Sequence, residues 1–278
     1  YSYRLPELEY LTRMAEVEPD TVTEIMATVT VSKETFNPEV VDRFLWISGL
    51  LPTTQLKKIL PKILKENWAQ LMAQFSRSGY EYKKMVQKLS QSKDYDSILY
   101  LTKIILTPRT KEEFSQSERI LSSDKLFYLD DISKTGIFEV ILAPENDKKE
   151  YFLKVFIEVF RGIIEISKDR KETVFERTEP FYLLDVDIFT LELDSNKKSY
   201  FREDIQNFIA TYKKLIQEAL GSVCDNETGA RRIYDNYIGA LPDSLTSWRL
   251  KLYALTLCPV IFKKEIEESL FRIFNVDR

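Results

Sequence analysis

Apolar side chains recur every three or four residues along most of the chain, which is the spacing of an amphipathic helix. Four such stripes lie in residues 1–65: Leu5, Leu8, Leu11, Met14 and Ala15; Val22, Ile25, Met26 and Val29; Val41, Phe44, Leu45 and Ile47; Leu56, Ile59, Leu60, Ile63 and Leu64. A proline stands near the start of every stripe, where its missing N–H group costs no hydrogen bond. These prolines are Pro6, Pro19, Pro38 and Pro52. The pattern predicts four short helices.

The second pair of predicted helices repeats the first pair. Pro6 and Pro38 are 32 residues apart, and Pro19 and Pro52 are 33 residues apart. This period is typical of helical-hairpin repeats, in which neighbouring hairpins stack and bury faces that one hairpin cannot bury alone. Pro61 lies inside the fourth stripe and predicts either a kink or a boundary between two shorter helices.

The same spacing continues through the rest of the chain. It predicts helices over 79–92, 94–106, 130–143, 148–167, 200–219, 226–239, 244–257 and 260–274. The stripe in 148–167 is the widest and predicts a central buried helix. Asn37 and Ser244 each have the side chain of an N-cap residue, and Pro259 is expected to open the last helix.

Two segments interrupt the helical pattern. Residues 107–124 are polar and indicate a boundary between domains or subdomains. Residues 169–198 end in an alternating stretch that fits either a short strand or a long ordered loop. We favour the loop, because a single strand would have no partner in a sheet.

The two ends of the chain resemble HEAT and armadillo repeats. The resemblance rests on Pro6, Glu7, Tyr10, Leu11, Met14 and Ala15, followed by Pro19, Val22, Ile25 and Met26, and on Trp248 to Leu255 followed by Ile261 and Phe262. It covers residues 1–106 and the last 80 residues. Such segments are similar to helical-repeat regions of large bacterial multidomain proteins. The resemblance implies an architecture and a scaffold role, and it carries over no functional residue.

The fold class that we expect is therefore all-α, as an α-solenoid of stacked HEAT-like hairpins. An irregular α-helical bundle is the alternative. We expect N-terminal repeats over 1–106, central helices with irregular loops over 107–198 and C-terminal hairpins over 199–278, joined as one continuous solenoid.

Composition argues against most enzyme classes. The 278 residues include no His and only 7 Gly. Without His there is no Ser-His-Asp triad, no HExxH zinc site and no usual general base near neutral pH. The glycines are isolated, so neither a Rossmann fingerprint nor a P-loop is present. We expect a protein without catalytic activity, cofactor or bound metal.

The cysteines and the apolar runs bear on the cellular location. Cys224 and Cys258 are too few for a disulfide framework, and we expect core residues or surface thiols in a reduced cytoplasm. No apolar stretch is long enough for a transmembrane helix. The chain begins at Tyr1 rather than Met, so we expect either a segment of a longer protein or a chain trimmed at its start.

Charge is unevenly distributed, although the net charge is only −4. Residues 57–103 contain ten basic side chains and four acidic ones. Lys58, Lys62, Lys65, Lys84 and Lys88 fall opposite the apolar stripes of their helices. They form either a basic ridge for an acidic partner or a nucleic-acid backbone, or an ordinary solvated face.

Two other groups of residues are candidates for binding. Arg231, Arg232 and Tyr234 are of the types favoured as interface anchors, or they pack and pair within the chain. Asp185 and Asp187 would point the same way on an extended segment and could hold a divalent cation. A solvated acidic loop explains the same two residues.

Three functions remain in order of preference. The first is a non-catalytic scaffold that binds a partner protein or a flanking domain of its own chain. The second is binding of nucleic acid through the basic face of residues 57–103. The third is a metal-dependent enzyme that uses Asp185 and Asp187.

Overall fold

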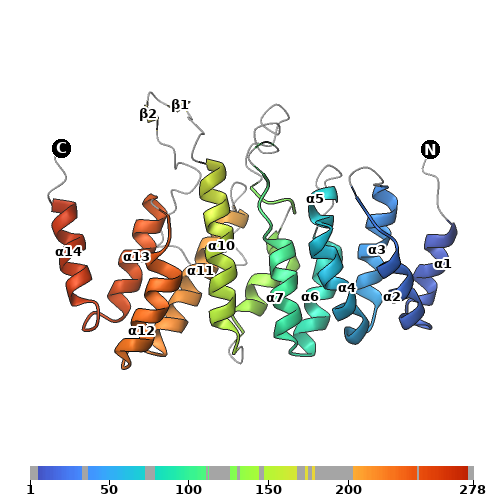
Figure 1. Ribbon diagram of the computed structural model, residues 1–278, viewed down its shortest axis with the longest axis horizontal. Helices are drawn as coiled ribbons and strands as arrows, with labels where there is room; N and C mark the ends of the chain where they lie inside the picture. Colours follow the sequence, from blue (N-terminus) through green and yellow to red (C-terminus); the bar gives the residue numbers. More distant parts are fainter. Residues whose placement is uncertain are drawn as a thin grey trace. The chain divides into compact units, whose positions relative to one another are not determined.

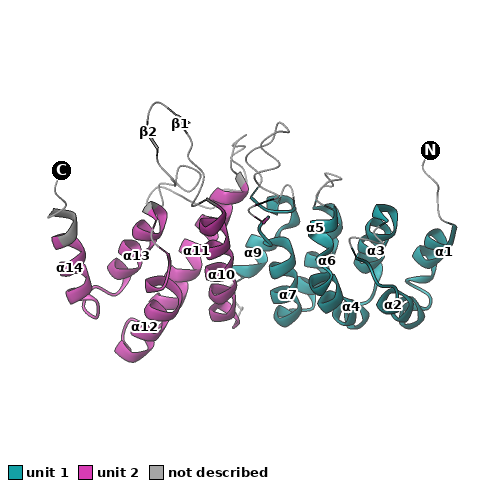
Figure 2. Cartoon of the chain, turned by 45° about the horizontal axis from the view of Figure 1, so that its top comes forward, with its two compact units in different colours: residues 1–109, 125–143 teal, residues 110–124, 144–278 magenta. Residues whose placement is uncertain are grey.

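The computed structural model describes residues 6–32, 37–72, 79–110, 112, 126–129, 132–143, 147–167, 173–174, 177–178, 203–242 and 244–274. The chain divides into two compact units (Figure 2). Unit 1 comprises residues 1–109 and 125–143, and unit 2 comprises residues 110–124 and 144–278. These boundaries differ from the expected segments 1–106, 107–198 and 199–278, because residues 125–143 belong to unit 1.

Helices make up nearly all of the described part of the chain, so the all-α class is confirmed (Figure 1). The elements of unit 1 are α1 (Pro6–Met14), α2 (Pro19–Thr28), α3 (Pro38–Leu50), α4 (Thr53–Lys65), α5 (Trp68–Met72), α6 (Tyr80–Gln91), α7 (Tyr95–Ile105), the 3-10 helix η2 (Ile132–Thr135) and α9 (Ile137–Ile141). The prolines predicted the first four starts correctly. Asn37 caps α3, since its side chain accepts a hydrogen bond from the N–H of Glu39 at 3.0 Å.

The helices of unit 1 pack in two rows. In one row α3 contacts both α1 and α6, and in the other α4 contacts both α2 and α7. Each row also packs on the other, because α1 contacts α2, α3 contacts α4, and α6 contacts α7. The apolar stripes meet between the rows, where Val41, Phe44, Leu56, Ile59 and Met85 are almost completely buried.

Unit 1 differs from the sequence prediction at two places. The helix expected over 130–143 is instead η2 and α9, because Gly136 between them has the left-handed φ of 74°. Helix α4 runs across Pro61 as one element from Thr53 to Lys65, so Pro61 is not a boundary between two helices.

Lys93 ends α6 in a left-handed conformation, with φ 52°. The N–H of Asp94 bonds to the carbonyl of Leu89 at 3.0 Å, as in a Schellman motif. Glycine adopts this conformation without steric cost, so Lys93→Gly is expected to raise the free energy of unfolding by about 1 kcal/mol.

Urea denaturation of the two proteins measures this difference. Lys83→Gly is the matched control, because Lys83 lies exposed inside α6. The same substitution there is expected to cost about 1 kcal/mol. A loss of stability in both variants would contradict the prediction for Lys93.

Unit 2 contains α10 (Lys149–Ser167), α11 (Glu203–Gly221), α12 (Glu227–Tyr234), a π-helical turn (Asp235–Gly239), α13 (Leu245–Leu257) and α14 (Lys263–Phe274). Helix α11 contacts α10, α12 and α13, and α14 packs on α13. The predicted cap Ser244 is confirmed, because its side chain accepts a hydrogen bond from the N–H of Ser247 at 3.0 Å.

Aromatic side chains fill the contact between α10 and α11. Phe156 stacks on Phe208 with ring centroids 4.7 Å apart, and Phe160 and Tyr212 lie beside them. All four residues are fully buried. The apolar stripe of residues 148–167 is therefore a buried face, as the sequence predicted.

The sequence predicted other parts of unit 2 less well. Helix α12 ends at Tyr234 and passes into the π-helical turn, whereas one helix was expected over 226–239. Helix α14 begins at Lys263, so Pro259 lies in the preceding turn rather than at the helix start. Strands β1 (Thr173–Val174) and β2 (Arg177–Thr178) form a short antiparallel pair, and the rest of 169–198 lies outside the described residues.

Candidate functional site

Two of the five lysines of the candidate basic ridge are paired with acidic side chains within unit 1. Lys58 lies 3.2 Å from Asp20, and Lys62 lies 2.6 Å from Glu66. Hydrogen bonds from Gln55 and Lys58 lower the pKa of Asp20. These contacts neutralise cations that a nucleic-acid backbone would need.

Lys88 does not lie on an open surface. Its ammonium donates hydrogen bonds to the carbonyls of Gly49 and Leu50, at 2.9 and 3.0 Å, and to that of Leu51. These carbonyls end α3 and have no partner inside the helix, so the cation caps a helix C-terminus. Partial burial lowers the pKa of Lys88. Its role is to join α6 to α3.

Three other lysines of unit 1 lie on three different helices. Lys65 lies exposed at the end of α4, Lys83 on α6 and Lys103 on α7. Within the described residues none of the three has an ion-pair partner. The structure thus leaves separate cations where the sequence indicated a ridge.

Lys84 lies in a different kind of environment, between two aromatic rings. Its ammonium is 3.9 Å from the ring centroid of Trp46 on α3 and 5.4 Å from that of Tyr80 on α6. The two rings stack with centroids 6.2 Å apart and planes inclined by 25°. Tyr80 is 51% exposed, and Trp46 is half-buried. We call these three residues the aromatic–lysine surface.

Gly49 helps to set this geometry. A Cβ atom at Gly49 would lie only 3.2 Å from the Cβ of Lys84, so the side chain of Lys84 crosses α3 where α3 has no side chain. The close approach directs the ammonium toward Trp46, one turn away on α3. A cation over an exposed aromatic ring is stabilised by about 0.5–1 kcal/mol.

Sequence reasoning named Lys84 but missed Trp46. A signal was present, because Trp46 falls outside the apolar stripe that includes Phe44, Leu45 and Ile47. A large aromatic residue on the polar side of a helix is a candidate contact residue. Only the structure shows that Tyr80, which lies 34 positions further along the chain, stacks on it.

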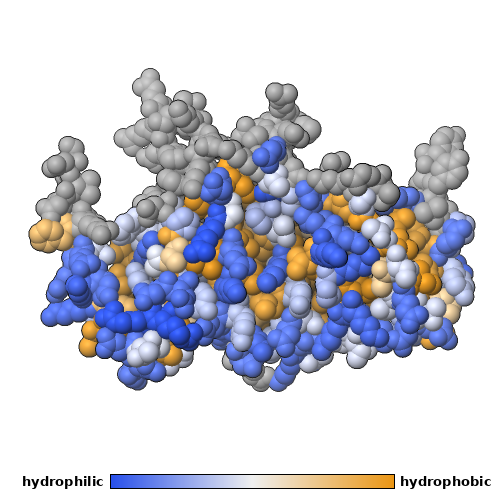
Figure 3. Space-filling view, in the orientation of Figure 1, coloured by the Kyte–Doolittle hydropathy of each residue, from blue (hydrophilic) through white to orange (hydrophobic). Residues whose placement is uncertain are grey.

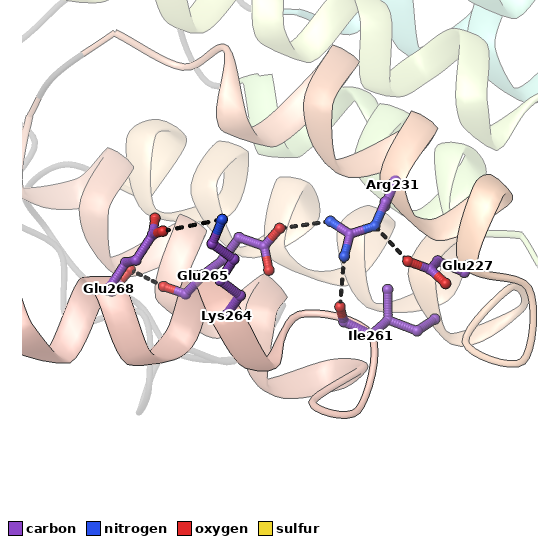
Figure 4. Close-up of polar contacts among 7 residues, drawn as sticks. Glu227, Arg231, Ile261, Lys264, Glu265 and Glu268 are labelled. Carbon is purple, nitrogen blue, oxygen red and sulfur yellow. Dashed lines mark hydrogen bonds and ion pairs between the residues drawn. The ribbon is translucent and has the colours of Figure 1, made fainter.

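Arg231 connects α12 to the start of α14 (Figure 4). Its guanidinium lies 2.9 Å from Glu227 and 2.6 Å from Glu265, and it donates to the carbonyl of Ile261 at 3.0 Å. The two carboxylates raise the pKa of Arg231. The close-up shows the two carboxylates and the carbonyl converging on this one side chain.

Arg232 and Tyr234 also contact other parts of unit 2. Arg232 binds both carboxylate oxygens of Glu150 on α10, and Tyr237 donates to the same carboxylate at 3.0 Å. The hydrogen bonds from Arg232 and Tyr237 lower the pKa of Glu150. Tyr234 packs on Phe262, with ring centroids 4.9 Å apart. These contacts favour the interpretation in which the three predicted anchors hold helices together.

The cysteines differ from the sequence prediction. Cys224 and Cys258 form a disulfide that joins the α11–α12 loop to the α13–α14 loop, with Cα atoms 5.2 Å apart. The expectation of two free cysteines is therefore wrong. Disulfides persist mainly in oxidising compartments, so the reasoning that pointed to a reduced cytoplasm loses its basis.

The structure does not describe the residues of the alternative metal site. Asp185 and Asp187 lie outside the described residues. Among the residues that are described, no three His, Cys, Asp or Glu side chains gather in a way that could hold a metal ion. None of the described helices is both long and apolar enough to cross a bilayer.

Hydrophilic residues cover most of the outward helix surfaces on the face shown in Figure 3, and hydrophobic residues show between the helices. Comparison of the chain with protein-family models, with curated proteins and with solved structures gave no match. A function for the aromatic–lysine surface is therefore inferred from the geometry of its residues alone.

Proposed function

We propose that this chain is a non-catalytic interaction scaffold built from HEAT-like helical hairpins. Its partner is a protein or a flanking domain of the same chain. The observation that carries the proposal is the aromatic–lysine surface on the row formed by α1, α3 and α6. It places a stacked Trp and Tyr where solvent reaches both.

The packing of unit 1 supports a repeat architecture. Successive helix pairs α1–α2, α3–α4 and α6–α7 each contribute one helix to each row. A helical-repeat protein has this arrangement, since every pair buries its apolar face against the next pair. One row then offers a continuous series of helices to a partner.

The composition of the aromatic–lysine surface supports protein binding. Trp and Tyr are the residue types most enriched among those that dominate binding energy at protein interfaces. Stacking of Trp46 on Tyr80 limits the motion of both rings before a partner arrives. Less conformational entropy is lost on binding when the contacting side chains are already ordered.

Nucleic acid fits the observations less well. A protein gains affinity for nucleic acid by neutralising phosphates with many cations. Here Lys58, Lys62 and Lys88 are already engaged within unit 1. We therefore rank a protein partner above the basic-face alternative of residues 57–103.

A quantitative pull-down tests the proposal. The purified chain and a Trp46→Ala/Tyr80→Ala variant are immobilised and exposed to an extract of the source cells. Retained proteins are identified by mass spectrometry, and retained nucleic acid is measured by ultraviolet absorbance. We expect the wild-type chain to retain one discrete protein roughly tenfold better than the double variant does. A tenfold ratio corresponds to a difference of about 1.4 kcal/mol in binding free energy.

Tyr100→Ala is the matched control. Tyr100 is 44% exposed on α7, so it has a similar area to lose without belonging to the aromatic–lysine surface. We expect this variant to retain the partner as the wild-type chain does. Retention of nucleic acid instead of protein, or of nothing at all, would contradict the proposal.

A further inference from the structure

We propose that the aromatic–lysine surface binds an acidic segment of its partner, with a carboxylate on the ammonium of Lys84 and an apolar side chain on the exposed ring of Tyr80. This inference rests on the proposed scaffold function and specifies the chemistry of the partner. Three observations support it.

The first observation is the unmatched charge of Lys84. Among the described residues, no carboxylate lies within ion-pair distance of its ammonium, which contacts only the rings of Trp46 and Tyr80. By contrast, Lys57 and Lys58 in the same unit are each paired with an aspartate. Ring faces carry partial negative charge but leave the full charge of an ammonium open to an anion.

The second observation is the local positive potential. Lys83 is exposed next to Lys84, and Lys88 follows one turn later on α6. The ammonium of Lys88 is engaged with the carbonyls at the end of α3, but its charge still acts on Lys84. A carboxylate arriving at Lys84 is attracted by these three cations, and the carboxylates of Glu81 on α6 and Glu16 near Lys88 reduce this attraction.

The third observation is the fixed position of the cation. Gly49 lets the side chain of Lys84 cross α3, and the Trp46 ring holds its end. An ammonium that is already ordered loses less entropy when it forms an ion pair than a free lysine does. The surface is thus preorganised for one anchoring carboxylate with an apolar neighbour, which fits an acidic peptide better than a long row of phosphates.

Fluorescence anisotropy with defined probes tests the inference. The first probe is a labelled peptide of glutamates around a central leucine, and the second replaces every glutamate by glutamine. Labelled oligothymidylate is the nucleic-acid probe. We expect the glutamate peptide to bind roughly tenfold more tightly than either of the other probes, and added salt to weaken it.

Charge-reversal variants locate the binding. Lys84→Glu is expected to weaken binding of the glutamate peptide at least tenfold. Lys84→Met keeps most of the aliphatic part of the side chain and is expected to weaken binding by a smaller factor. Lys103→Glu makes the same change of net charge on α7 and is expected to leave the affinity within about twofold. Circular dichroism confirms that each variant is folded.

The indole signals in the NMR spectrum give a second readout. The chain has 3 Trp, and Trp68 is fully buried. We expect the glutamate peptide to shift the signal that disappears in Trp46→Phe and to leave that of Trp68 in place.

Three results would overturn the inference: no binding of the glutamate peptide at millimolar concentration, equal losses in Lys84→Glu and Lys103→Glu, or tighter binding of oligothymidylate. Failure here is distinguishable from failure of the scaffold proposal. If the pull-down partner is retained equally by the wild-type chain and by Lys84→Glu, the scaffold stands and the acidic-segment inference falls.

Discussion

Reduction of the Cys224–Cys258 disulfide is expected to lower the free energy of unfolding of unit 2 by about 4 kcal/mol. The disulfide joins residues separated by 34 positions. A cross-link that closes a loop of this length lowers the conformational entropy of the unfolded chain, and the lost entropy corresponds to about 4 kcal/mol. No described side chain of α14 is fully buried, and the turn before it is held by Arg231 and by the buried ring of Phe262.

Thermal unfolding with and without a phosphine reductant measures this effect. The Cys224→Ser/Cys258→Ser variant is the control. We expect its melting temperature to equal that of the reduced wild-type chain and to be the same with and without reductant. Mass spectrometry of the oxidised protein should find no free thiol. A melting temperature that is the same with and without reductant would refute the stabilising role of the disulfide.

Glu66→Ala is expected to cost about 3 kcal/mol of stability in unit 1. The Glu66 carboxylate accepts hydrogen bonds from Lys62 at 2.6 Å, from the buried indole N–H of Trp68 at 2.9 Å and from the backbone of Val31 at 3.4 Å. Removing the carboxylate leaves a largely buried ammonium and a buried indole N–H group without a hydrogen-bond partner. A buried polar group that loses its partner destabilises the folded state strongly, because it is shielded from water as well.

Urea denaturation, followed by intrinsic tryptophan fluorescence, compares Glu66→Ala with two variants. Glu66→Gln keeps an acceptor for the indole and is expected to lose less stability. Glu24→Ala, at an exposed position of α2, is expected to stay within about 0.5 kcal/mol of the wild-type chain. Equal values for Glu66→Ala and Glu24→Ala would contradict the role given to Glu66.

The helices were predictable where local chemistry sets their ends. Pro19 and Pro38 mark helix starts because the missing N–H of proline costs no hydrogen bond in the first turn of a helix, and Asn37 and Ser244 supply caps. Gly136 interrupts a predicted helix because it adopts a left-handed φ of 74°, a conformation that glycine can adopt without a Cβ clash but that its presence in the sequence does not require.

The candidate site was predictable only in part. Sequence reasoning put Lys84 and Lys88 on one polar face, which correctly places both on α6. The contacts that separate their roles come from α3, nearly 40 positions earlier in the chain for Lys88. Periodicity within one helix carries no information about such distant partners. The same limit applies to the pairing of Cys224 with Cys258.

Photo-crosslinking from position 80 tests the central claim most directly. Tyr80 is replaced by the photoreactive residue p-benzoyl-phenylalanine, and Tyr100 is replaced in the same way as a control. We predict that irradiation in an extract of the source cells links position 80, and not position 100, to one discrete protein. Equal crosslinking at both positions, or a nucleic-acid adduct at position 80, would contradict the account.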